Sequence, residues 1–144
     1  MIDEFMQVAI EEAKKGKAEN GIPIGSFLVK NRKVIGRGYN RRVQDNDPIA
    51  HAEIVCLRSA GRIGTYGDTV LYSTLMPCYL CAGAIVQFGI KNVVVSESET
   101  FQGAKEFMEL HNVKVIDLDL FECKQLMCKF IRENPSLCNE DIGK

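Results

Sequence analysis

The first part of the chain carries a helical pattern and then a hairpin pattern. Apolar residues recur at helical spacing over residues 2–19, which predicts an amphipathic helix, and Asn20-Gly21 follows as a stop signal. The apolar segments 23–30 and 33–39 are separated by Asn31-Arg32, where a tight turn is expected. The pattern therefore predicts one helix followed by two antiparallel strands.

Two prolines mark the starts of later helices. Asp47-Pro48 places an N-cap residue before a proline in the first turn, so we expect a helix from there to about Ala60. Gly61 would end that helix. Pro77 opens a second helix, which we expect to end near Gly89.

The remainder of the chain alternates strand and helix patterns. A brief helix is expected over 104–110, and Asp119 is a candidate cap for a last helix that runs to about Glu133. The inner face of that last helix would carry Phe121, Met127, Phe130 and Ile131. The predicted strands are 69–73, 93–96 and 114–118. We expect an α/β fold, a three-layer α-β-α sandwich with a mixed sheet of about five strands, formed by residues 1–144 as one domain.

Composition and charge narrow the class of protein. The 144 residues are 46% hydrophobic and 26% charged, which suits one globular domain with its own core. The net charge of −1 gives no overall basic field, which weighs against nucleic acid as the main partner. The start of the chain lacks the pattern of a signal peptide, and no apolar stretch approaches the ~20 residues of a membrane span. We therefore expect a cytoplasmic protein without membrane association.

The six cysteines are expected to be thiols or metal ligands, because a disulfide framework is typical of short secreted chains. Only Cys78 and Cys81 have the spacing of a ligand pair. Cys56 lies in an apolar helical segment, and Cys123 and Cys128 lie in the last amphipathic segment. We expect these three to pack in the core as small hydrophobic residues.

His51, Cys78 and Cys81 are the kind of three-ligand set that zinc uses when its fourth position stays open to water. Both ligand groups fall in the first turn of a predicted helix, where free N–H groups and the helix dipole favour thiolates. The two cysteines would project from one face of their helix. Glu53 lies two residues after the histidine and could reach a zinc-bound water without being a ligand. The expected cofactor is one Zn²⁺ per chain.

Two other interpretations of these residues are weaker. A lone C-x-x-C can be a redox pair, but that role leaves His51 and Glu53 unexplained, and the flanking residues are atypical of it. A structural zinc site normally has four protein ligands, and the sequence contains no second C-x-x-C or H-x-x-x-H. The other histidine, His111, lies in a polar stretch and is expected at the surface.

The pattern H-x-E followed by P-C-x-x-C is the signature of zinc-dependent nucleobase deaminases. In that chemistry zinc lowers the pKa of water from 15.7 toward about 7. Glu53, the expected catalytic residue, would take the water proton and deliver it to a ring nitrogen, and would later protonate the departing amine. General acid–base catalysis of this kind contributes roughly 10²–10⁴ in rate.

Beyond the zinc motif, the chain resembles the fungal-type cytosine deaminase of the cytidine deaminase-like superfamily, nearly end to end. The segments that carry the resemblance are 21–25, 36–40, 51–53, 75–85 and 140–143. The C-terminal segment Glu140-Asp141-Ile142-Gly143 is the most telling, because other branches of the superfamily do not usually end that way. The resemblance implies a helix–sheet–helix sandwich, deamination of a free base and a homodimer.

The resemblance also implies pocket residues. Asn40 matches an asparagine that binds the polar edge of the pyrimidine, and Asp141 matches a C-terminal aspartate that contacts the exocyclic amine. Phe101 matches an aromatic packed on the base, and Ile24 and Leu75 match pocket-lining positions. From the residues alone, Asn40 would be a turn former, Phe101 a core aromatic and Asp141 a solvated tail residue.

The chain departs from the family pattern around the pocket. The family has a tryptophan in the C-terminal segment that closes over the base, but this chain contains no tryptophan. Cys138 stands at that position, and Asn139 follows where another aromatic is expected. Val43 stands where the family places an aromatic near the pocket, and Met76 is larger than the usual residue there. A thiol in place of a ring leaves room for a different ligand shape, so Cys138 joins the expected pocket residues.

Cytosine is the expected substrate, with isocytosine or creatinine as alternatives because they carry a similar amine-bearing carbon. A nucleoside, guanine and tRNA adenosine are less favoured alternatives. A tRNA adenosine deaminase would need a basic, aromatic-bearing face for a flipped nucleotide. The basic runs 14–17 and Arg41-Arg42 are short, and the C-terminal tail is acidic. The expected partners are therefore a small-molecule substrate and a second copy of the chain, with no nucleic acid and no membrane.

Overall fold

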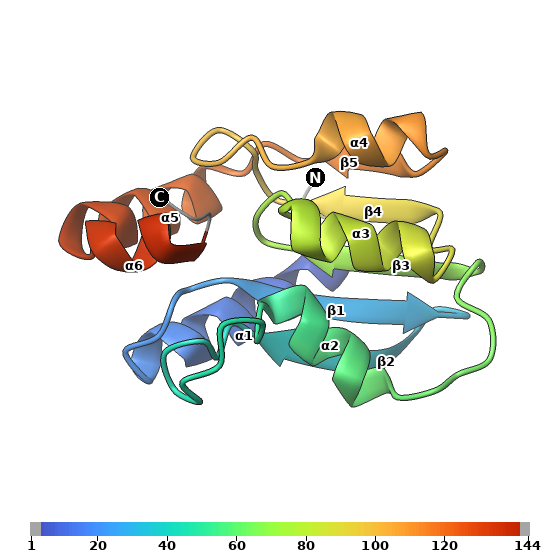
Figure 1. Ribbon diagram of the computed structural model, residues 1–144, viewed down its shortest axis with the longest axis horizontal. Helices are drawn as coiled ribbons and strands as arrows, with labels where there is room; N and C mark the ends of the chain where they lie inside the picture. Colours follow the sequence, from blue (N-terminus) through green and yellow to red (C-terminus); the bar gives the residue numbers. More distant parts are fainter. Residues whose placement is uncertain (1–3, 142–144) are drawn as a thin grey trace.

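The fold is built on one mixed sheet with helices on both of its faces (Figure 1). The computed structural model describes residues 4–141. The strands are β1 (Gly25–Lys30), β2 (Lys33–Tyr39), β3 (Thr69–Ser73), β4 (Asn92–Val95) and β5 (Lys114–Asp117). The helices are α1 (Glu4–Ala18), α2 (Ala52–Ala60), α3 (Tyr79–Gln87), α4 (Lys105–Leu110), α5 (Phe121–Glu133) and α6 (Pro135–Asp141).

The strand order is β2-β1-β3-β4-β5. β1 is antiparallel to β2 and β3, whereas β3, β4 and β5 run parallel. The β1–β2 connection is a two-residue turn in which Asn31 and Arg32 both have positive φ, the conformation that matches the twist of a hairpin. The parallel strands are joined by α3 and α4 as crossovers. The mixed five-stranded sheet predicted from the sequence is confirmed.

Alternate residues of the central strands supply two separate cores. Leu28, Leu71 and Val93 pack with α2, α3 and α4 on one face of the sheet. The adjacent strand residues Phe27, Tyr72 and Val94 pack on the other face of the sheet. Their partners there include Met6 of α1 and Cys123 of α5. Strands that are covered on both faces are typically continuous apolar runs, which explains the apolar segments of β3 and β4 in the sequence. The three-layer sandwich is therefore also confirmed.

The two C-terminal helices lie beyond one end of the sheet, where the chain leaves β3 and β4 (Figure 1). A third apolar cluster joins them to the body of the domain. Within it, Met127 and Phe130 of α5 pack with Ile22, Ile24 and Leu75. This end of the sheet is the usual place for a ligand site in α/β folds. No helix among residues 4–141 is both long and apolar enough to cross a membrane.

The predicted start of α2 is wrong. The helix begins at Ala52, because Asp47 forms a local turn in which its carboxylate accepts the Ile49 N–H at 3.0 Å. A side chain used in this way is an alternative to N-capping. The shift places His51 at the N-cap of α2 rather than inside its first turn.

The predicted cap of α5 is also wrong. The helix begins at Phe121 after the N-cap Leu120. Asp119 instead has a φ of 54°, and its N–H donates to the side chain of Asp117 at 2.9 Å. Two side chains of α5 that we expected in the core lie outside it, since Phe121 is 69% exposed and Cys128 is exposed.

Candidate zinc-dependent active site

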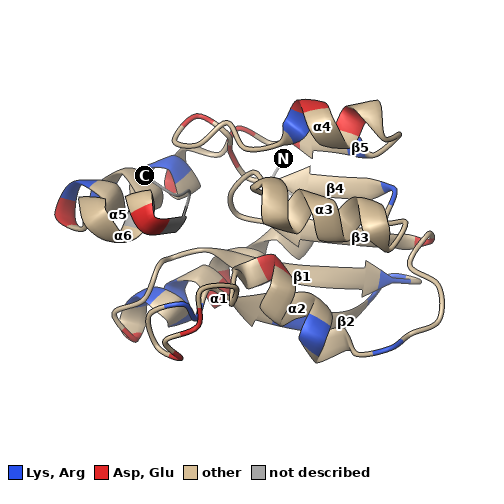
Figure 2. Cartoon of the chain, viewed as in Figure 1, with Lys and Arg blue, Asp and Glu red and all other residues tan. Residues whose placement is uncertain are grey.

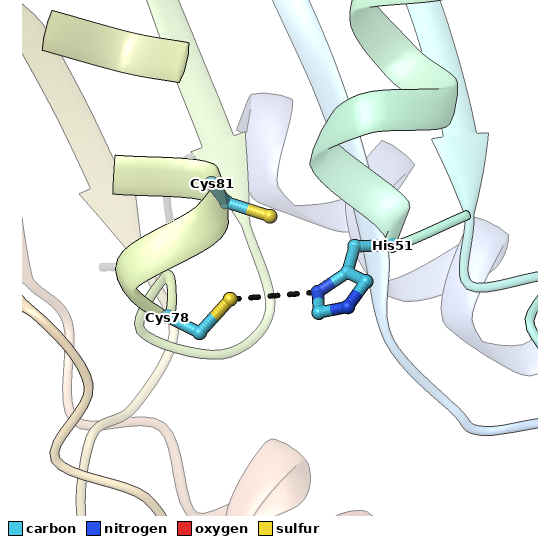
Figure 3. A group of neighbouring side chains, drawn as sticks. All are labelled: His51, Cys78 and Cys81. Atoms are coloured by element: carbon cyan, nitrogen blue, oxygen red, sulfur yellow. Dashed lines mark hydrogen bonds between the residues drawn. The ribbon is translucent and has the colours of Figure 1, made fainter. Parts of the chain in front are cut away.

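The three predicted metal ligands meet at the N-termini of two neighbouring helices (Figure 3). His51 is the N-cap of α2, Cys78 is the N-cap of α3, and Cys81 lies one turn into α3. Cys78 Sγ lies 3.5 Å from His51 Nδ1, and the three ligand atoms all lie within 4.8 Å of one another.

The spacing of these atoms fits zinc. With Zn–S and Zn–N bonds of about 2.3 and 2.0–2.1 Å, tetrahedral ligands lie roughly 3.6 Å apart, close to the separation of Cys78 Sγ and His51 Nδ1. Among the side chains that the structure describes, no fourth His, Cys, Asp or Glu joins the cluster. Three protein ligands are typical of a catalytic zinc site, because the fourth position stays open for water or substrate.

The two thiols differ in acidity. A hydrogen bond from the Cys81 thiol, followed by one with His51, outweighs burial and lowers the pKa of Cys78 to about 4. The same bond to Cys78, together with burial, raises the pKa of Cys81 well above its usual range. For His51, burial lowers the pKa, but the hydrogen bond and charge of Cys78 raise it by more. Zinc binding would therefore have to displace the Cys81 proton.

Glu53 lies in the first turn of α2 and is only 5% exposed. Burial, followed by the negative charge of Cys78, raises the pKa of the Glu53 carboxyl to about 7. A group with this pKa can both accept and return a proton near neutral pH. Glu53 is not one of the clustered ligands, which leaves its carboxyl free for proton transfer.

A cavity of about 190 Å³ opens beside the ligands. Four of the pocket residues inferred from the family resemblance line it, namely Ile24, Asn40, Leu75 and Phe101. The remaining lining residues are Ile22, His51, Glu53, Met76, Cys78, Thr100, Met127, Ile131 and Asn139.

Two predicted pocket residues cannot be placed in the cavity. The side chains of Cys138 and Asp141 lie outside the part of the chain that the structure describes, although both residues belong to α6. Their neighbour Asn139 does line the cavity. The C-terminal helix therefore forms part of the pocket wall.

Several pocket residues were not predicted. Met127 and Ile131 lie one turn apart on α5, and their helical spacing indicated only a core face. Thr100 had no recognisable signal, because its role depends on a loop that follows β4. Phe101 was predicted as a pocket residue, and the position of Thr100 next to it is the one clue that the sequence offered.

Asn40 is oriented by the backbone. Its side-chain oxygen accepts the N–H of Arg42 at 3.0 Å, and the residue is almost fully buried. Because a backbone N–H can only donate, the amide oxygen is the group that faces Arg42. The NH₂ group of Asn40 is thereby left for a ligand in the cavity.

Comparison with known proteins agrees with this geometry. Residues 1–97 match the family model described as the cytidine and deoxycytidylate deaminase zinc-binding region. The chain belongs to this deaminase family. The matched region contains all three ligands and Glu53, which explains why the motif could be recognised from sequence.

Similar proteins include a cytosine deaminase and tRNA-specific adenosine deaminases. The cytosine deaminase of Candida albicans is 44% identical over 142 residues, which cover 96% of this chain and 95% of that protein. A tRNA-specific adenosine deaminase of Buchnera aphidicola is 43% identical over 97 residues, covering 65% of this chain and 64% of that protein. A tRNA-specific adenosine deaminase of Streptococcus pyogenes is 36% identical over 141 residues, covering 90% of this chain and 89% of that protein.

Solved structures share the fold. A structure from a study of tRNA:A34 deaminases aligns with a TM-score of 0.71 at 32% identity, covering 78% of this chain and 95% of that chain. A guanine deaminase from Nitrosomonas europaea aligns with a TM-score of 0.73, covering 87% of this chain and 81% of that chain. Its identity of 20% supports the shared fold alone.

The site can carry out hydrolytic deamination. His51, Cys78 and Cys81 would hold zinc, which supplies a Lewis acid that makes bound water acidic near neutral pH. Glu53 can accept the water proton at its carboxylate and pass it to a ring nitrogen of the substrate. The carboxyl can then protonate the departing amine.

Proposed function

We propose that the protein deaminates a free small heterocycle, with cytosine as the preferred substrate. Water and cytosine would give uracil and ammonia. The observation that carries the proposal is the match with a cytosine deaminase over 96% of this chain. That match continues past residue 97 into the segments that supply the pocket residues Thr100, Phe101, Met127 and Ile131.

The charges of the molecule support a free base over a nucleic acid. α1, α4 and α5 each carry both basic and acidic residues, so none of them presents a purely basic surface (Figure 2). None of the described residues that line the pocket is Lys or Arg. A polynucleotide site would need basic groups for the phosphates on either side of the target base.

The two basic runs are largely paired with acids. Such pairs reduce the positive field that a phosphate backbone would meet. The pairs are Lys14–Glu122 at 2.9 Å, Lys15–Glu12 at 2.8 Å, Arg41–Asp45 at 3.0 Å and Arg42–Glu140 at 3.3 Å.

A different cyclic amidine is the second candidate substrate. Asn139 lines the cavity where the cytosine deaminase pattern has an aromatic, and Met76 adds bulk on another wall. An amide in the wall offers hydrogen bonds that a ring would not. Isocytosine and creatinine each carry an amine-bearing ring carbon that could occupy such a pocket.

An ammonia-release assay tests the proposal. The zinc-loaded protein would be given cytosine, isocytosine, creatinine, cytidine, guanine and adenine in parallel. We expect the highest kcat/KM with cytosine, and no release by Glu53→Ala under the same conditions. Preference for cytidine, guanine or adenine would contradict the proposal, whereas preference for isocytosine or creatinine would support the second candidate.

We also propose that the protein is a homodimer that associates through α3. Leu80 is 44% exposed, and open space surrounds Gly83 on the same helix, so a second helix could approach closely. Leu80→Glu should shift the sedimentation coefficient from dimer to monomer. Leu110→Glu, at a 75% exposed position on α4, should leave the dimer intact. A wild-type monomer would contradict this proposal.

We further infer that the protein works in the reducing cytoplasm. The five cysteines whose side chains the structure describes are all free thiols. Free thiols persist where glutathione and thioredoxin keep them reduced. Oxidation of Cys78 and Cys81 would remove two of the three zinc ligands.

A further inference from the structure

A fully buried carboxylate lies behind the pocket wall. Glu97 follows β4 and has no exposed surface. Its Oε2 accepts the backbone N–H of Thr100 at 3.0 Å, and its Oε1 accepts the Thr100 hydroxyl. Thr100 lines the cavity beside the zinc ligands. The carboxylate is therefore connected to the pocket through one threonine.

The segment that contains Thr100 is anchored at both ends to the loop before α3. At its start, the Glu97 carbonyl accepts the Met76 N–H at 3.1 Å. At its end, the Ala104 N–H donates to the Pro77 carbonyl at 2.9 Å. Between these anchors, the two bonds to Glu97 hold Thr100 in position. Thr100 is thereby fixed relative to the loop that leads into the zinc-binding cysteines.

Glu97 also determines the hydrogen-bonding direction of the threonine. A hydroxyl has one proton and two lone pairs, whereas a carboxylate only accepts. Because the Thr100 hydroxyl donates its proton to Glu97, it can offer a ligand only its lone pairs. Asn40 has the opposite constraint, since its amide oxygen is occupied by the Arg42 N–H and its NH₂ group remains for the ligand. Of these two cavity-lining residues, Thr100 therefore retains only an acceptor and Asn40 retains a donor.

We propose that Glu97 is a positioning residue that makes Thr100 the acceptor for a ring N–H of the substrate. With Asn40 donating to a ring carbonyl, the pocket selects heterocycles that carry an N–H beside a C=O. Cytosine has this pair as N1–H and C2=O. In cytidine, N1 carries the sugar and the donor is lost. The inference rests on the proposed deamination of a free base and gives a reason why the base is preferred to its nucleoside.

Thr100→Val tests the acceptor role, because it removes the hydroxyl at nearly constant side-chain shape. Cytosine and 1-methylcytosine are the paired substrates, and they differ only at the N–H in question. We expect kcat/KM for cytosine to fall about tenfold, the effect of losing one buried hydrogen bond. The variant should use 1-methylcytosine as well as the wild-type protein does. An equal loss with both substrates, or no loss with cytosine, would overturn the inference.

Glu97→Gln tests the positioning role. The glutamine amide can donate to the Thr100 hydroxyl, which frees the hydroxyl proton and reverses its direction. We expect a loss with cytosine similar to that of Thr100→Val, and no further loss in the double variant, because both changes act on one hydrogen bond. Independent, additive losses would contradict the role assigned to Glu97. If Glu97→Gln does not fold, the substrate comparison in Thr100→Val decides the matter.

Ser98→Ala is the matched control. Its hydroxyl also bonds a carboxylate, that of Asp117, in the same segment, and Ser98 does not line the cavity. We expect this variant to keep wild-type kinetics with both substrates. Zinc content and melting temperature, measured for every variant, separate a change in recognition from a loss of fold or metal.

The results also distinguish this inference from the proposed function. Turnover of cytosine with no selective effect of Thr100→Val would leave the function standing and remove the inference. A second outcome is that the protein deaminates isocytosine instead of cytosine, and that Thr100→Val loses activity with isocytosine but not with N-methylated isocytosine. This outcome would remove cytosine as substrate and support the inference. Turnover restricted to cytidine or to adenosine in a tRNA would contradict both, because neither base presents a ring N–H beside a C=O.

Discussion

Cys78 Sγ lies 3.5 Å from His51 Nδ1, although 27 residues separate the two positions in the chain. The contact exists because α2 and α3 cover the same face of the sheet and begin at the same end of it. Each ligand group stands at a helix N-terminus, where the helix dipole favours negative charge. The same arrangement brings Glu53 to the edge of the cavity.

Glu53→Ala should retain zinc and lose nearly all turnover. The carboxyl is not a ligand, so its removal leaves the metal site intact, while proton transfer loses roughly 10²–10⁴ in rate. Metal analysis of the purified variant and ammonia release from cytosine measure the two properties separately. Substantial remaining activity in the zinc-loaded variant would show that another group moves the protons.

Cys78→Ser should lose zinc and the stability that zinc confers. A metal whose free concentration is 100 times its dissociation constant stabilises the folded state by about 2.7 kcal/mol. We therefore expect a chelator to lower the melting temperature of the wild-type protein and to leave that of Cys78→Ser unchanged. Cys128→Ser, at an exposed position, should respond to the chelator as the wild type does. A chelator response in Cys78→Ser would mean that the metal is held elsewhere.

Gly103→Ala should destabilise the pocket loop. Gly103 has a φ of 64°, and a Cβ there would lie 2.6 Å from the Pro77 carbonyl oxygen. Gly89→Ala is the control, because Gly89 has a similar φ of 76° but open space around it. Both variants carry the strain of a left-handed residue, about 1–2 kcal/mol. Chemical denaturation should show a greater loss in Gly103→Ala, with lower kcat/KM; equal losses would indicate that the contact with Pro77 is unimportant.

Asp141→Ala should weaken substrate binding more than zinc binding. The family resemblance implies that Asp141 contacts the exocyclic amine of the substrate, and its neighbour Asn139 lines the cavity. We expect a raised KM for cytosine at unchanged zinc content. Ser136→Ala, an exposed position at the start of the same helix, serves as control. Normal kinetics in Asp141→Ala would remove the tail from the substrate site.

The sequence predicted features that depend on local signals. Asn31 and Arg32 marked the hairpin turn, and both adopt positive φ as that turn requires. The apolar strands and the ligand spacing of Cys78 and Cys81 were equally clear, because hydrophobic periodicity and metal chemistry each constrain neighbouring positions.

Other features depend on contacts that no local signal encodes. The Asp47 carboxylate can accept a backbone N–H at the start of a helix or within a turn, and the sequence alone does not decide between the two. In the structure it accepts the Ile49 N–H within a turn. Met127 and Ile131 were expected on a buried face, yet packing of α5 at the end of the sheet makes that face a pocket wall. Thr100 acquires its importance only through Glu97. These residues could be assigned only once the tertiary structure was known.

The most direct test of the central claim compares cytosine with adenosine in tRNA, the substrates named for two of the similar proteins. The zinc-loaded protein would be assayed for deamination of cytosine and of adenosine in a tRNA over a range of salt concentrations. We predict uracil and ammonia from cytosine at a rate that salt barely changes, and no inosine in the tRNA. Deamination of the tRNA with no reaction of cytosine, at a rate that falls steeply with salt, would contradict the account.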